Sequence, residues 1–365
     1  MTSIRLAALL GDGIGPDIVE ATMRVLRTAC ERRGVDLDFD VLPSGLTALE
    51  TDGSTLPEST LEALPGYPGW LLGPVSHHAY PSNTDARYVN PSGFLRKHHE
   101  LYANVRPARS LDGIPAFNDQ VDLIVVRENT EGFYADRNLV EGDGEFKPDS
   151  DTVLSLRVVT RRASIRLAHR AFELARDRNR RNKVTIVHKA NVLSRGDGLF
   201  LECCREVAEQ YPEVSVEDYH VDACAMALVT RPEEFDVIAT TNMFGDILSD
   251  EAAGLVGGLG LAPGLNVGDH YAMAQATHGS APDIAHLGVA NPVAEILSGK
   301  LLLGWLAQRM TMQGLREAAA DVELAVENTL REGSSLTPDL GGSESTQTMT
   351  EATVEQLERL TECDS

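Results

Sequence analysis

Short apolar runs alternate along the chain with turns and with amphipathic segments. The first run, residues 4–10, is followed by the glycine-containing turn 11–15, and Pro16 then opens a segment with apolar residues at helical spacing. Similar runs, each followed by polar or glycine-containing residues, occupy positions 70–72, 123–126, 184–187 and 237–239. This alternation of strand and helix patterns predicts an α/β protein with several parallel strands.

Polar residues directly follow three of the predicted strands. They are Arg127, the pair His188 and Lys189, and the segment 240–246. In open α/β sheets, ligands bind beyond the carboxyl ends of the strands. We therefore expect these residues to contribute to one site.

Residues 136–160 contain a different feature. The acidic, glycine-containing segment 136–151 is followed by the segment 152–160, in which apolar and polar residues alternate. The pattern predicts an exposed strand there, and an unpaired edge of this kind would suit dimerisation.

Composition and charge restrict the class of protein. The 365 residues allow two domains, and the 42% hydrophobic content with 31 Gly and 17 Pro is typical of an α/β enzyme. Lys and Arg number 32 against 55 Asp and Glu, so the net charge of −23 disfavours nucleic acid and membrane surfaces as partners. An anionic substrate must therefore be drawn in by a local cluster of positive charge.

Two further patterns bear on the cellular compartment. No apolar stretch approaches the roughly 18–20 residues of a membrane span. The cysteines show neither a C-x-x-C pair nor the spacing of a zinc site; they are Cys30, Cys203, Cys204, Cys224 and Cys363. We expect free thiols and a reducing, cytoplasmic location.

Asp246 and Asp250 are candidates for binding a metal ion. They are four residues apart, so on a helix both carboxylates project from one face. Oxygen ligands in this arrangement suit Mg²⁺ or Mn²⁺. The alternative from spacing alone is a solvated helix face that carries two unrelated acids.

Arg96, Arg106 and Arg127 are the candidate cluster of positive charge. Guanidinium groups bind carboxylates through two parallel hydrogen bonds and stay charged when desolvated, so three of them could hold a di- or tricarboxylate. The alternative is that they are surface arginines, which is less suitable for Arg127 because it follows an apolar strand.

Lys189 and Tyr134 are candidates for proton transfer. Lys189 stands at the end of a predicted strand, where a lysine could serve as a general base. Tyr134 follows the next polar segment after Arg127 and could donate a proton. A packed tyrosine with its hydroxyl in water is the alternative.

Two tight loops could approach phosphate groups. Residues 11–16 read Gly-Asp-Gly-Ile-Gly-Pro and lack the G-x-G-x-x-G spacing of a Rossmann turn. Residues 278–284 form a second glycine-containing loop with backbone N–H groups that could bind phosphate, or an ordinary turn.

Taken together, these segments resemble the β-decarboxylating dehydrogenase family, which includes isocitrate, homoisocitrate, isopropylmalate, and tartrate or D-malate dehydrogenases. The resemblance covers about residues 4–305. The segments that carry it are residues 11–16, 95–97, 101–107, 127–132, 189–191, 221–223, 241–250 and 278–284.

The resemblance implies an isopropylmalate dehydrogenase-like fold of two α/β domains that is not a Rossmann fold. The larger, cofactor-binding domain would comprise residues 1–104 and 258–365. The smaller domain, residues 105–257, would carry metal ligands, a dimer-forming arm and the dimer interface. The implied assembly is a homodimer with shared active sites, to which Lys189 and Asp222 would be contributed by the partner subunit.

The resemblance also assigns residues to roles. Those implied to bind the hydroxy-di- or tricarboxylate substrate are Ser92, Arg96, Arg106 and Arg127, and those implied to bind Mg²⁺ or Mn²⁺ are Asp222, Asp246 and Asp250. Lys189, directly or through water or Asp222, would accept the C2 hydroxyl proton while hydride passes to NAD. After loss of carbon dioxide, Tyr134 would return a proton to the carbon.

The cofactor is implied to be NAD. Asp283 and Ile284 stand where NADP-dependent relatives carry Lys and Tyr, and an acid there would repel a 2′-phosphate. The full set of implied cofactor-binding residues is Ile14, Asn191, His278, Gly279, Ser280, Ala281, Asp283, Ile284 and Asn291.

The substrate is less closely defined. Residues 89–95 lack the Glu and paired Leu with which isopropylmalate enzymes surround an isopropyl group, and they lack the Trp-containing loop of tartrate and D-malate enzymes. The small polar Asn90 and Ser92 are similar to residues of isocitrate enzymes, although interchanged. Isocitrate or a close analogue such as homoisocitrate is favoured, and 3-isopropylmalate, tartrate and D-malate stay open.

Two other classes of function compete with this interpretation. A non-catalytic regulatory subunit is disfavoured because the candidate catalytic and metal-binding residues are all present. A metal-dependent hydrolase built on the acidic pair gives no reason for three arginines beside an NAD-type loop.

Overall fold

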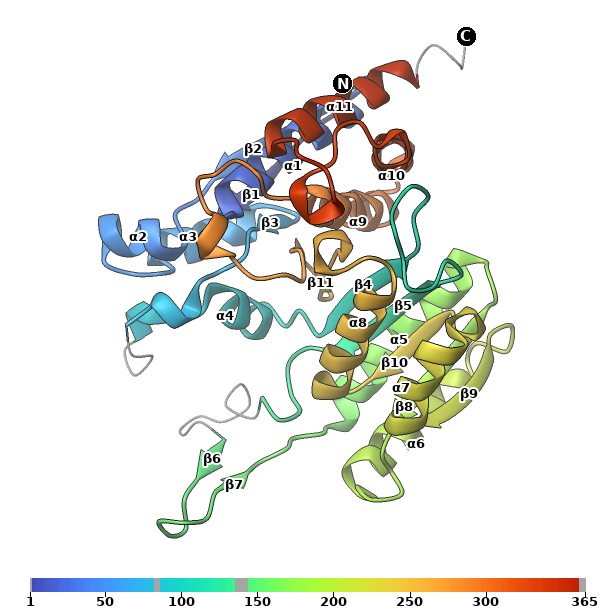
Figure 1. Cartoon of the computed structure of the whole chain (residues 1–365). Helices are drawn as coiled ribbons and strands as arrows, with labels where there is room; N and C mark the ends of the chain where they lie inside the picture. The colour runs from blue at the N-terminus through green and yellow to red at the C-terminus, as the bar shows by residue number, and fades with distance from the viewer. Residues whose placement is uncertain (1, 82–85, 135–143, 361–365) are drawn as a thin grey trace.

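The computed structural model describes residues 2–81, 86–134 and 144–360. Within these ranges, ten strands form one mixed sheet that passes through the protein (Figure 1). In spatial order they are β2 (Val35–Val41), β1 (Thr2–Leu9), β3 (Trp70–Leu72), β12 (Ala272–Ala274), β11 (Leu265–Val267), β4 (Ala103–Arg109), β5 (Asp122–Glu128), β10 (Val237–Thr240), β8 (Lys183–His188) and β9 (Ser215–His220). The strands expected near positions 4–10, 70–72, 123–126, 184–187 and 237–239 are all present.

The sheet contains two parallel groups that run in opposite directions. Strands β2, β1, β3 and β12 form one group, and β5, β10, β8 and β9 form the other. Antiparallel pairing of β11 with β12 and β4, and of β4 with β5, joins them. The several parallel strands that were expected are present in both groups, and the antiparallel junction of β11 and β4 is an addition to them. The strands that contain Arg127 or precede Lys189 and Thr241 all point the same way.

The two parallel groups also come from different parts of the chain. The first is built from residues 2–72 and 272–274, and the second from residues 122–240. This arrangement supports an organisation in two parts. The domain boundaries, residues 1–104 with 258–365 and residues 105–257, stay a prediction because the sheet is continuous from β11 through β4 to β5.

Helices cover the sheet with amphipathic faces. They are α1 (Gly15–Arg32), α2 (Gly45–Asp52), α3 (Glu58–Ala63), α4 (Pro91–His98), α5 (Arg161–Arg178), α6 (Gly196–Ala208), α7 (Val221–Thr230), α8 (Asn242–Leu255), α9 (Val293–Met310), α10 (Gln313–Glu332) and α11 (Thr346–Arg359). The helix expected after Pro16 is α1, and Asp246 and Asp250 do lie on a helix, α8.

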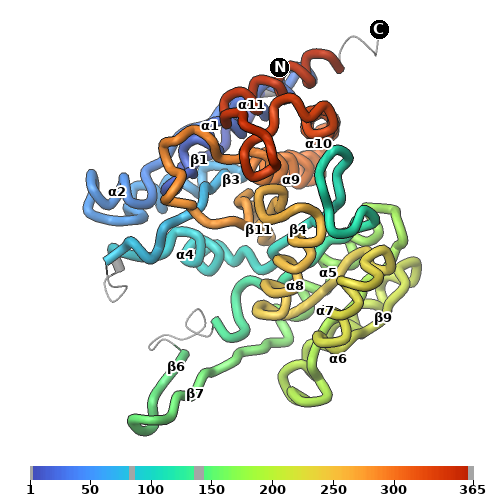
Figure 2. The backbone as a smooth tube through the Cα atoms, in the orientation of Figure 1, coloured from blue at the N-terminus to red at the C-terminus, as the bar shows by residue number. Residues whose placement is uncertain are grey.

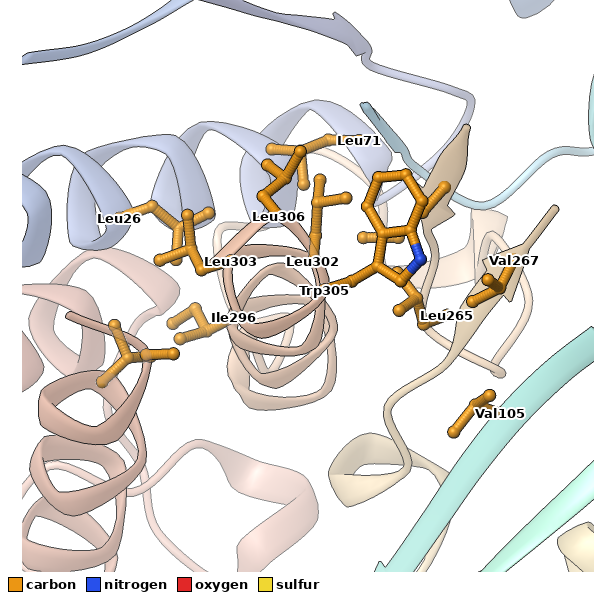
Figure 3. Packing of buried hydrophobic residues seen from close by; sticks show 14 of the residues in the cluster. Leu26, Leu71, Val105, Leu265, Val267, Ile296, Leu302, Leu303, Trp305 and Leu306 are labelled. Carbon is orange, nitrogen blue, oxygen red and sulfur yellow. The ribbon is translucent and has the colours of Figure 1, made fainter. Parts of the chain in front are cut away.

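The largest core cluster lies around α9. Its Leu302, Leu303 and Leu306 are fully buried, and they point towards Leu26 of α1 and Leu71 of β3 (Figure 3). The helices approach closely at Gly299, where an added Cβ atom would stand 2.7 Å from Leu26 Cδ1. Eight residues separate the cofactor loop candidate, residues 278–284, from the start of α9.

A small arm projects from the rest of the structure (Figures 1 and 2). It consists of β6 (Glu145–Phe146) paired with β7 (Leu154–Ser155), and Val158 pairs with Gly132 at its base. The strand expected over residues 152–160 is thus only two residues long. Residues 136–143 of the expected polar segment lie outside the described residues.

The described helices and cysteines bear on the absence of a membrane span and on the free thiols that were expected. None of the described helices is both long and apolar enough to cross a bilayer. Cys30, Cys203, Cys204 and Cys224 are buried free thiols, and burial raises the pKa of Cys30 and Cys224 to about 12. Cys363 lies outside the described ranges.

Candidate active site

Two buried arginines stand side by side at the junction of β4 and β5. Arg106 is 8% exposed and Arg127 is 3% exposed, so neither is a surface arginine. Antiparallel pairing places Asn104 opposite Arg127, and the Asn104 side chain accepts a hydrogen bond from Arg106 Nε. Arg127 Nε donates to Asn242 Oδ1 over 2.9 Å. Both guanidinium groups are thereby held in fixed orientations.

The acids of α8 meet these arginines. Arg106 Nη1 lies 3.2 Å from Asp246 Oδ1 and 3.1 Å from Asp250 Oδ1, and Arg127 also pairs with Asp246. The close approach depends on Gly245, where a Cβ atom would stand 2.6 Å from Arg127 Cβ. Both carboxylates therefore pair with Arg106, which disfavours the alternative of two unrelated acids on a solvated helix face.

Tyr134 completes this cluster. Its hydroxyl donates to Asp246 Oδ2 over 3.3 Å, and the Arg127 guanidinium lies 5.7 Å from its ring centroid. The tyrosine hydroxyl is thus directed towards the acidic pair, which disfavours the alternative of a hydroxyl in bulk water.

Partial burial shifts the pKa values of two charged side chains in this cluster. Burial, followed by repulsion from Arg127, lowers the pKa of Arg106 to about 10. Burial raises the pKa of Asp250, although Arg106 opposes this effect. Both shifts show that burial disfavours the charged forms of these side chains. A bound ion or an anionic substrate could reduce this desolvation free energy.

The carboxylates of Asp246 and Asp250 are the candidate ligands for a divalent metal ion. Among the described residues, no group of three or more His, Cys, Asp or Glu side chains is placed to hold a metal ion. Asp246 and Asp250 nevertheless present carboxylate oxygens from one helix face, and their side chains are 37% and 53% exposed. Such a pair fits Mg²⁺ or Mn²⁺, which keep several positions for water, substrate or another ligand.

A second group of residues surrounds Arg96 of α4. Arg96 Nη2 donates to Gln275 Oε1 over 3.0 Å, and Nη1 donates to Asn129 Oδ1 over 3.3 Å. Ser92 Oγ also donates to Gln275 Oε1, over 2.7 Å. Asn90 caps α4 by accepting a hydrogen bond from Gly93 N, which fixes the position of Ser92 and Arg96 on this helix.

A cavity of about 160 Å³ connects the arginines with the cofactor loop candidate. Its lining residues are Pro74, Val75, Asn90, Ser92, Arg96, Asn104, Arg106, Gln275, Ala276, Thr277, His278 and Gly279. This lining contains two arginines and, among the described residues, no Asp or Glu. The cavity therefore suits an anionic ligand. Larger hollows lie elsewhere on the protein and contain none of these candidate residues.

Lys189 and Asp222 form a separate pair. Lys189 follows β8, Asp222 lies in the first turn of α7, and their side chains make an ion pair with each other that lowers the pKa of Asp222. Two hydrogen bonds fix the backbone of the Lys189 loop. His188 Nδ1 accepts one from Ala190 N, and Asp197 Oδ2 accepts the other from Lys189 N. Within the described part of one chain, no hydrogen bond or ion pair joins this pair to Arg106, Arg127 or the α8 acids.

The two glycine-containing loops meet. Ile14 N donates to Ser280 O over 2.9 Å, and an added Cβ atom on Gly13 would stand 2.0 Å from that oxygen. Ala281 has a φ of 40°, an unusual value for a residue with a side chain. These contacts hold the backbone of residues 278–281 in a tight turn at the edge of the cavity.

The other predicted cofactor residues lie in three places. Asp283 and Ile284 are exposed in the turn after Ala281. Asn291 is 7% exposed, donates to Asp339 Oδ2 and accepts from Val293 N at the start of α9. Asn191 is exposed in the Lys189 loop, and among the described residues no backbone hydrogen bond joins that loop to residues 278–284.

Sequence reasoning missed several residues that organise the site. They are Asn104, Asn129, Asn242, Ser249 and Gln275, and each makes a hydrogen bond to Arg96, Arg106 or Arg127. Gln275 directly follows β12 and stands three residues before His278, so its position at a strand end was a usable signal. The others are neutral side chains whose spacing carries no pattern.

Glu295 holds the backbone two residues before the cofactor loop candidate. It is fully buried on α9, its Oε2 accepts from Ala276 N over 2.7 Å, and its Oε1 has no hydrogen-bond partner among the described residues. Burial raises the pKa of Glu295 to about 8. The folded protein therefore holds this proton more tightly than the unfolded chain does, and the resulting stability is lost as the pH rises towards 8.

Replacing Glu295 with glutamine should therefore change the pH dependence of stability. Glu295→Gln keeps an acceptor for Ala276 N and cannot ionise, so its melting temperature relative to wild type should rise between pH 5 and pH 9. One pKa unit corresponds to about 1.4 kcal/mol, so the relative gain should be roughly 2–4 °C or more. Calorimetry at both pH values measures it. A melting-temperature difference that is the same at both pH values would contradict the assignment.

Comparison with known proteins places the chain in a family. A family model described as isocitrate/isopropylmalate dehydrogenase matches residues 5–354. The chain belongs to the isocitrate/isopropylmalate dehydrogenase family, and the resemblance inferred from its motifs is confirmed.

Individual relatives cover almost the whole chain. A 3-isopropylmalate dehydrogenase of Methanothermobacter thermautotrophicus is 42% identical over 98% of this chain and 100% of its own length. Isocitrate dehydrogenase (NAD) catalytic subunit 5, mitochondrial, of Arabidopsis thaliana is 43% identical over 98% of this chain and 89% of its own. The crystal structure of isocitrate dehydrogenase from Methylococcus capsulatus superposes with a TM-score of 0.84 at 41% identity, covering 97% and 99% of the two chains. The expected α/β fold of this family is confirmed, and relatives of similar identity differ in substrate.

Proposed function

We propose that this protein is an NAD-dependent and divalent-metal-dependent dehydrogenase. It would oxidise and decarboxylate a malate with a polar 3-substituent, isocitrate or a close analogue, to a 2-oxo acid. The observation that carries the proposal is the meeting of Arg106 and Arg127 with Asp246, Asp250 and Tyr134 beside a cavity without acidic lining residues. Membership of the isocitrate/isopropylmalate dehydrogenase family supports the same reaction class.

The arginines would bind the substrate carboxylates. Arg106 and Arg127 pair with Asp246, so they suit the carboxylates nearest the reacting carbons, while Arg96 and Ser92, which are bound to Gln275, suit the 3-substituent. Substrate carboxylates would replace Asp246 and Asp250 as partners of the guanidinium groups. The acids would then be available to a divalent ion.

The remaining residues would move protons. NAD, held by the 278–284 loop, would supply an acceptor for the C2 hydride, and a divalent ion, held by Asp246 and Asp250, would supply a Lewis acid for the C2 oxygen. Lys189, beside Asp222, would take the proton of the C2 hydroxyl. Tyr134, held by its hydrogen bond to Asp246, would deliver a proton to C3 after carbon dioxide has left.

A homodimer would bring the two halves of this machinery together. Lys189 and Asp222 are paired with each other and, by the family resemblance, would complete the site of a second copy. Large apolar side chains are exposed on the helices that carry the acids: Met226 of α7 is 61% exposed and Ile247 of α8 is 58% exposed. Phe146 and Leu154 of the arm are 50% and 45% exposed. These surfaces support a dimer interface over α7, α8 and the arm.

A substrate panel tests the proposed function. Purified protein would be supplied with Mn²⁺, NAD and each of isocitrate, homoisocitrate, 3-isopropylmalate, tartrate and D-malate, while NADH absorbance and carbon dioxide release are followed. We expect both products in equal amounts, with isocitrate or homoisocitrate giving the highest kcat/KM. Absence of turnover with every one of these acids would sink the proposal and favour a regulatory subunit.

Cofactor choice gives a separate prediction. Asp283 and Ile284 are exposed at the end of the 278–284 loop, which is proposed to hold the adenosine end of NAD, and an aspartate there repels a 2′-phosphate. The double variant Asp283→Lys with Ile284→Tyr should therefore shift the NAD-to-NADP ratio of kcat/KM towards NADP by at least about tenfold. Steady-state kinetics with both cofactors measure it, with Asp283→Asn as a charge-only control. An unchanged ratio would show that another segment selects the cofactor.

A further inference from the structure

Asp12, in the turn formed by residues 11–16, is a buried carboxylate whose partners are all neutral. It is 4% exposed, and within the described ranges it forms no ion pair. Its Oδ1 accepts a hydrogen bond from Leu46 N over 2.6 Å, and its Oδ2 accepts from Ser76 N over 2.7 Å and from the Tyr80 hydroxyl over 2.6 Å. Burial of a carboxylate is unfavourable unless hydrogen bonds replace its lost water. The three donors therefore explain how Asp12 can be buried here.

The surroundings of Asp12 are built to accept a carboxylate. Leu46 N belongs to the first turn of α2, and the N-terminus of a helix favours negative charge. At Gly45, an added Cβ atom would stand 2.3 Å from Asp12 Oδ1, so this close approach requires glycine. Burial, followed by the hydrogen bond to Asp12, raises the pKa of Tyr80, so its hydroxyl keeps the proton that it donates.

Asp12 also joins three loops at the edge of the cavity. Asp12 N donates to Pro74 O over 2.7 Å, and the carboxylate accepts from Ser76 N in the same loop after β3. Ser76 Oγ donates in turn to Ser280 Oγ over 2.7 Å. The turn 11–16 contacts the cofactor loop candidate directly as well, through Ile14 N and Ser280 O. Residues of the loop after β3 and of the cofactor loop candidate line the 160 Å³ cavity.

We propose that Asp12 is a positioning residue that holds the loops 73–76 and 278–284 in the arrangement that binds NAD. The inference rests on the proposed function and concerns its cofactor. Asp12 acts through Ser76: the carboxylate fixes Ser76 N, and Ser76 Oγ fixes the Ser280 hydroxyl. Without the carboxylate, Leu46 N and Ser76 N lose their acceptor at a buried position, which is unfavourable. The two loops are therefore expected to shift until water reaches these N–H groups.

Measurements of NAD affinity test the inference without turnover. Asp12→Ala removes the acceptor for all three donors and should weaken NAD binding, measured by calorimetry, by at least about tenfold. Asp12→Asn should lie between wild type and Asp12→Ala, because its amide nitrogen must face either Leu46 N or the donors Ser76 N and Tyr80. The affinity for isocitrate with Mn²⁺, measured in the same way, should change by less than about threefold, because no hydrogen bond joins Asp12 to the arginines of the site.

Two further readouts separate positioning from a general loss of stability. In Asp12→Ala, KM for NAD should rise by at least about tenfold, whereas kcat at saturating NAD should stay within about threefold, because the groups proposed to transfer protons are unchanged. Hydrogen–deuterium exchange should become faster in residues 73–76 and 276–284 and stay unchanged in α10.

Asp321→Ala is the matched control for the loss of a buried carboxylate. Asp321 of α10 is 7% exposed and accepts two hydrogen bonds from Arg33, away from the loops that Asp12 joins. This variant should lower the melting temperature, as Asp12→Ala does, but it should leave NAD affinity within about threefold of wild type.

The outcomes distinguish the inference from the proposed function. An NAD affinity in Asp12→Ala within threefold of wild type would overturn the inference, and so would an equal loss of NAD affinity in Asp321→Ala. If Asp12→Ala does not fold, Asp12→Asn and Tyr80→Phe decide, and wild-type NAD affinity in both would overturn the inference. A wild type that binds NAD but turns over no hydroxy acid would contradict the proposed function alone, because the variants still report on NAD binding. A wild type that binds no NAD would overturn both.

Discussion

Replacing Lys189 with methionine should lower turnover by about 10²–10⁴-fold, the usual contribution of general acid–base catalysis. Without the amine, nothing at this position accepts the C2 hydroxyl proton, so hydride release is slow and little keto acid forms. Tyr134→Phe keeps the ring that stacks near Arg127 and loses only the hydroxyl directed at Asp246. It should retain substrate affinity and slow the step after decarboxylation.

Supplying the oxidised β-keto acid directly separates the two roles. With Mn²⁺ present, Lys189→Met should recover most of its deficit in product formation, because the oxidation step is bypassed, whereas Tyr134→Phe should recover little. Carbon dioxide release and incorporation of solvent deuterium at C3 are the measurements. Lys189→Arg, which keeps a cation beside Asp222, serves as the control for loss of the ion pair. Equal recovery by Lys189→Met and Tyr134→Phe would refute the division of labour.

Much of the framework could be predicted from the sequence because its signals are local. Apolar runs end just before Arg127 and before the pair His188 and Lys189, and these residues lie where β5 and β8 end. The four-residue spacing of Asp246 and Asp250 placed them on one face of α8, and both contact Arg106. The antiparallel strands β4 and β11 were not predicted, because their short runs carry no signal of direction. Their reversal is what brings Asn104 opposite Arg127.

The buried polar residues could not be predicted for a different physical reason. Gln275, Asn242 and Glu295 matter through single hydrogen bonds to residues far away in the chain, and no spacing rule links such pairs. Arg96 and Ser92 were found as candidates because they resemble a family motif. The Gln275 amide that joins them could be identified only from the structure, in which β12 pairs with β3.

Mixing two inactive variants should restore activity if the active sites are shared between subunits. Lys189→Met removes the proposed base, and Asp246→Asn removes a proposed metal ligand from the other cluster, so each homodimer has two defective sites. In a hybrid dimer with shared sites, one site receives both substitutions and the other receives neither. Random reassembly makes about half of the dimers hybrids, so roughly a quarter of wild-type activity should return.

The experiment distinguishes shared sites from sites within one chain. If Lys189 served the Asp246 of its own chain, every site in a hybrid would carry one of the two substitutions and no activity would return. The two variants are mixed, dissociated in denaturant and refolded together, with each variant refolded alone as the control. Mixing Asp246→Asn with Arg106→Lys, both in the cluster proposed to belong to one chain, should give no recovery. Recovery in that pair but not in the first would place Lys189 and Asp246 in the same subunit's site and contradict the proposed exchange across the dimer.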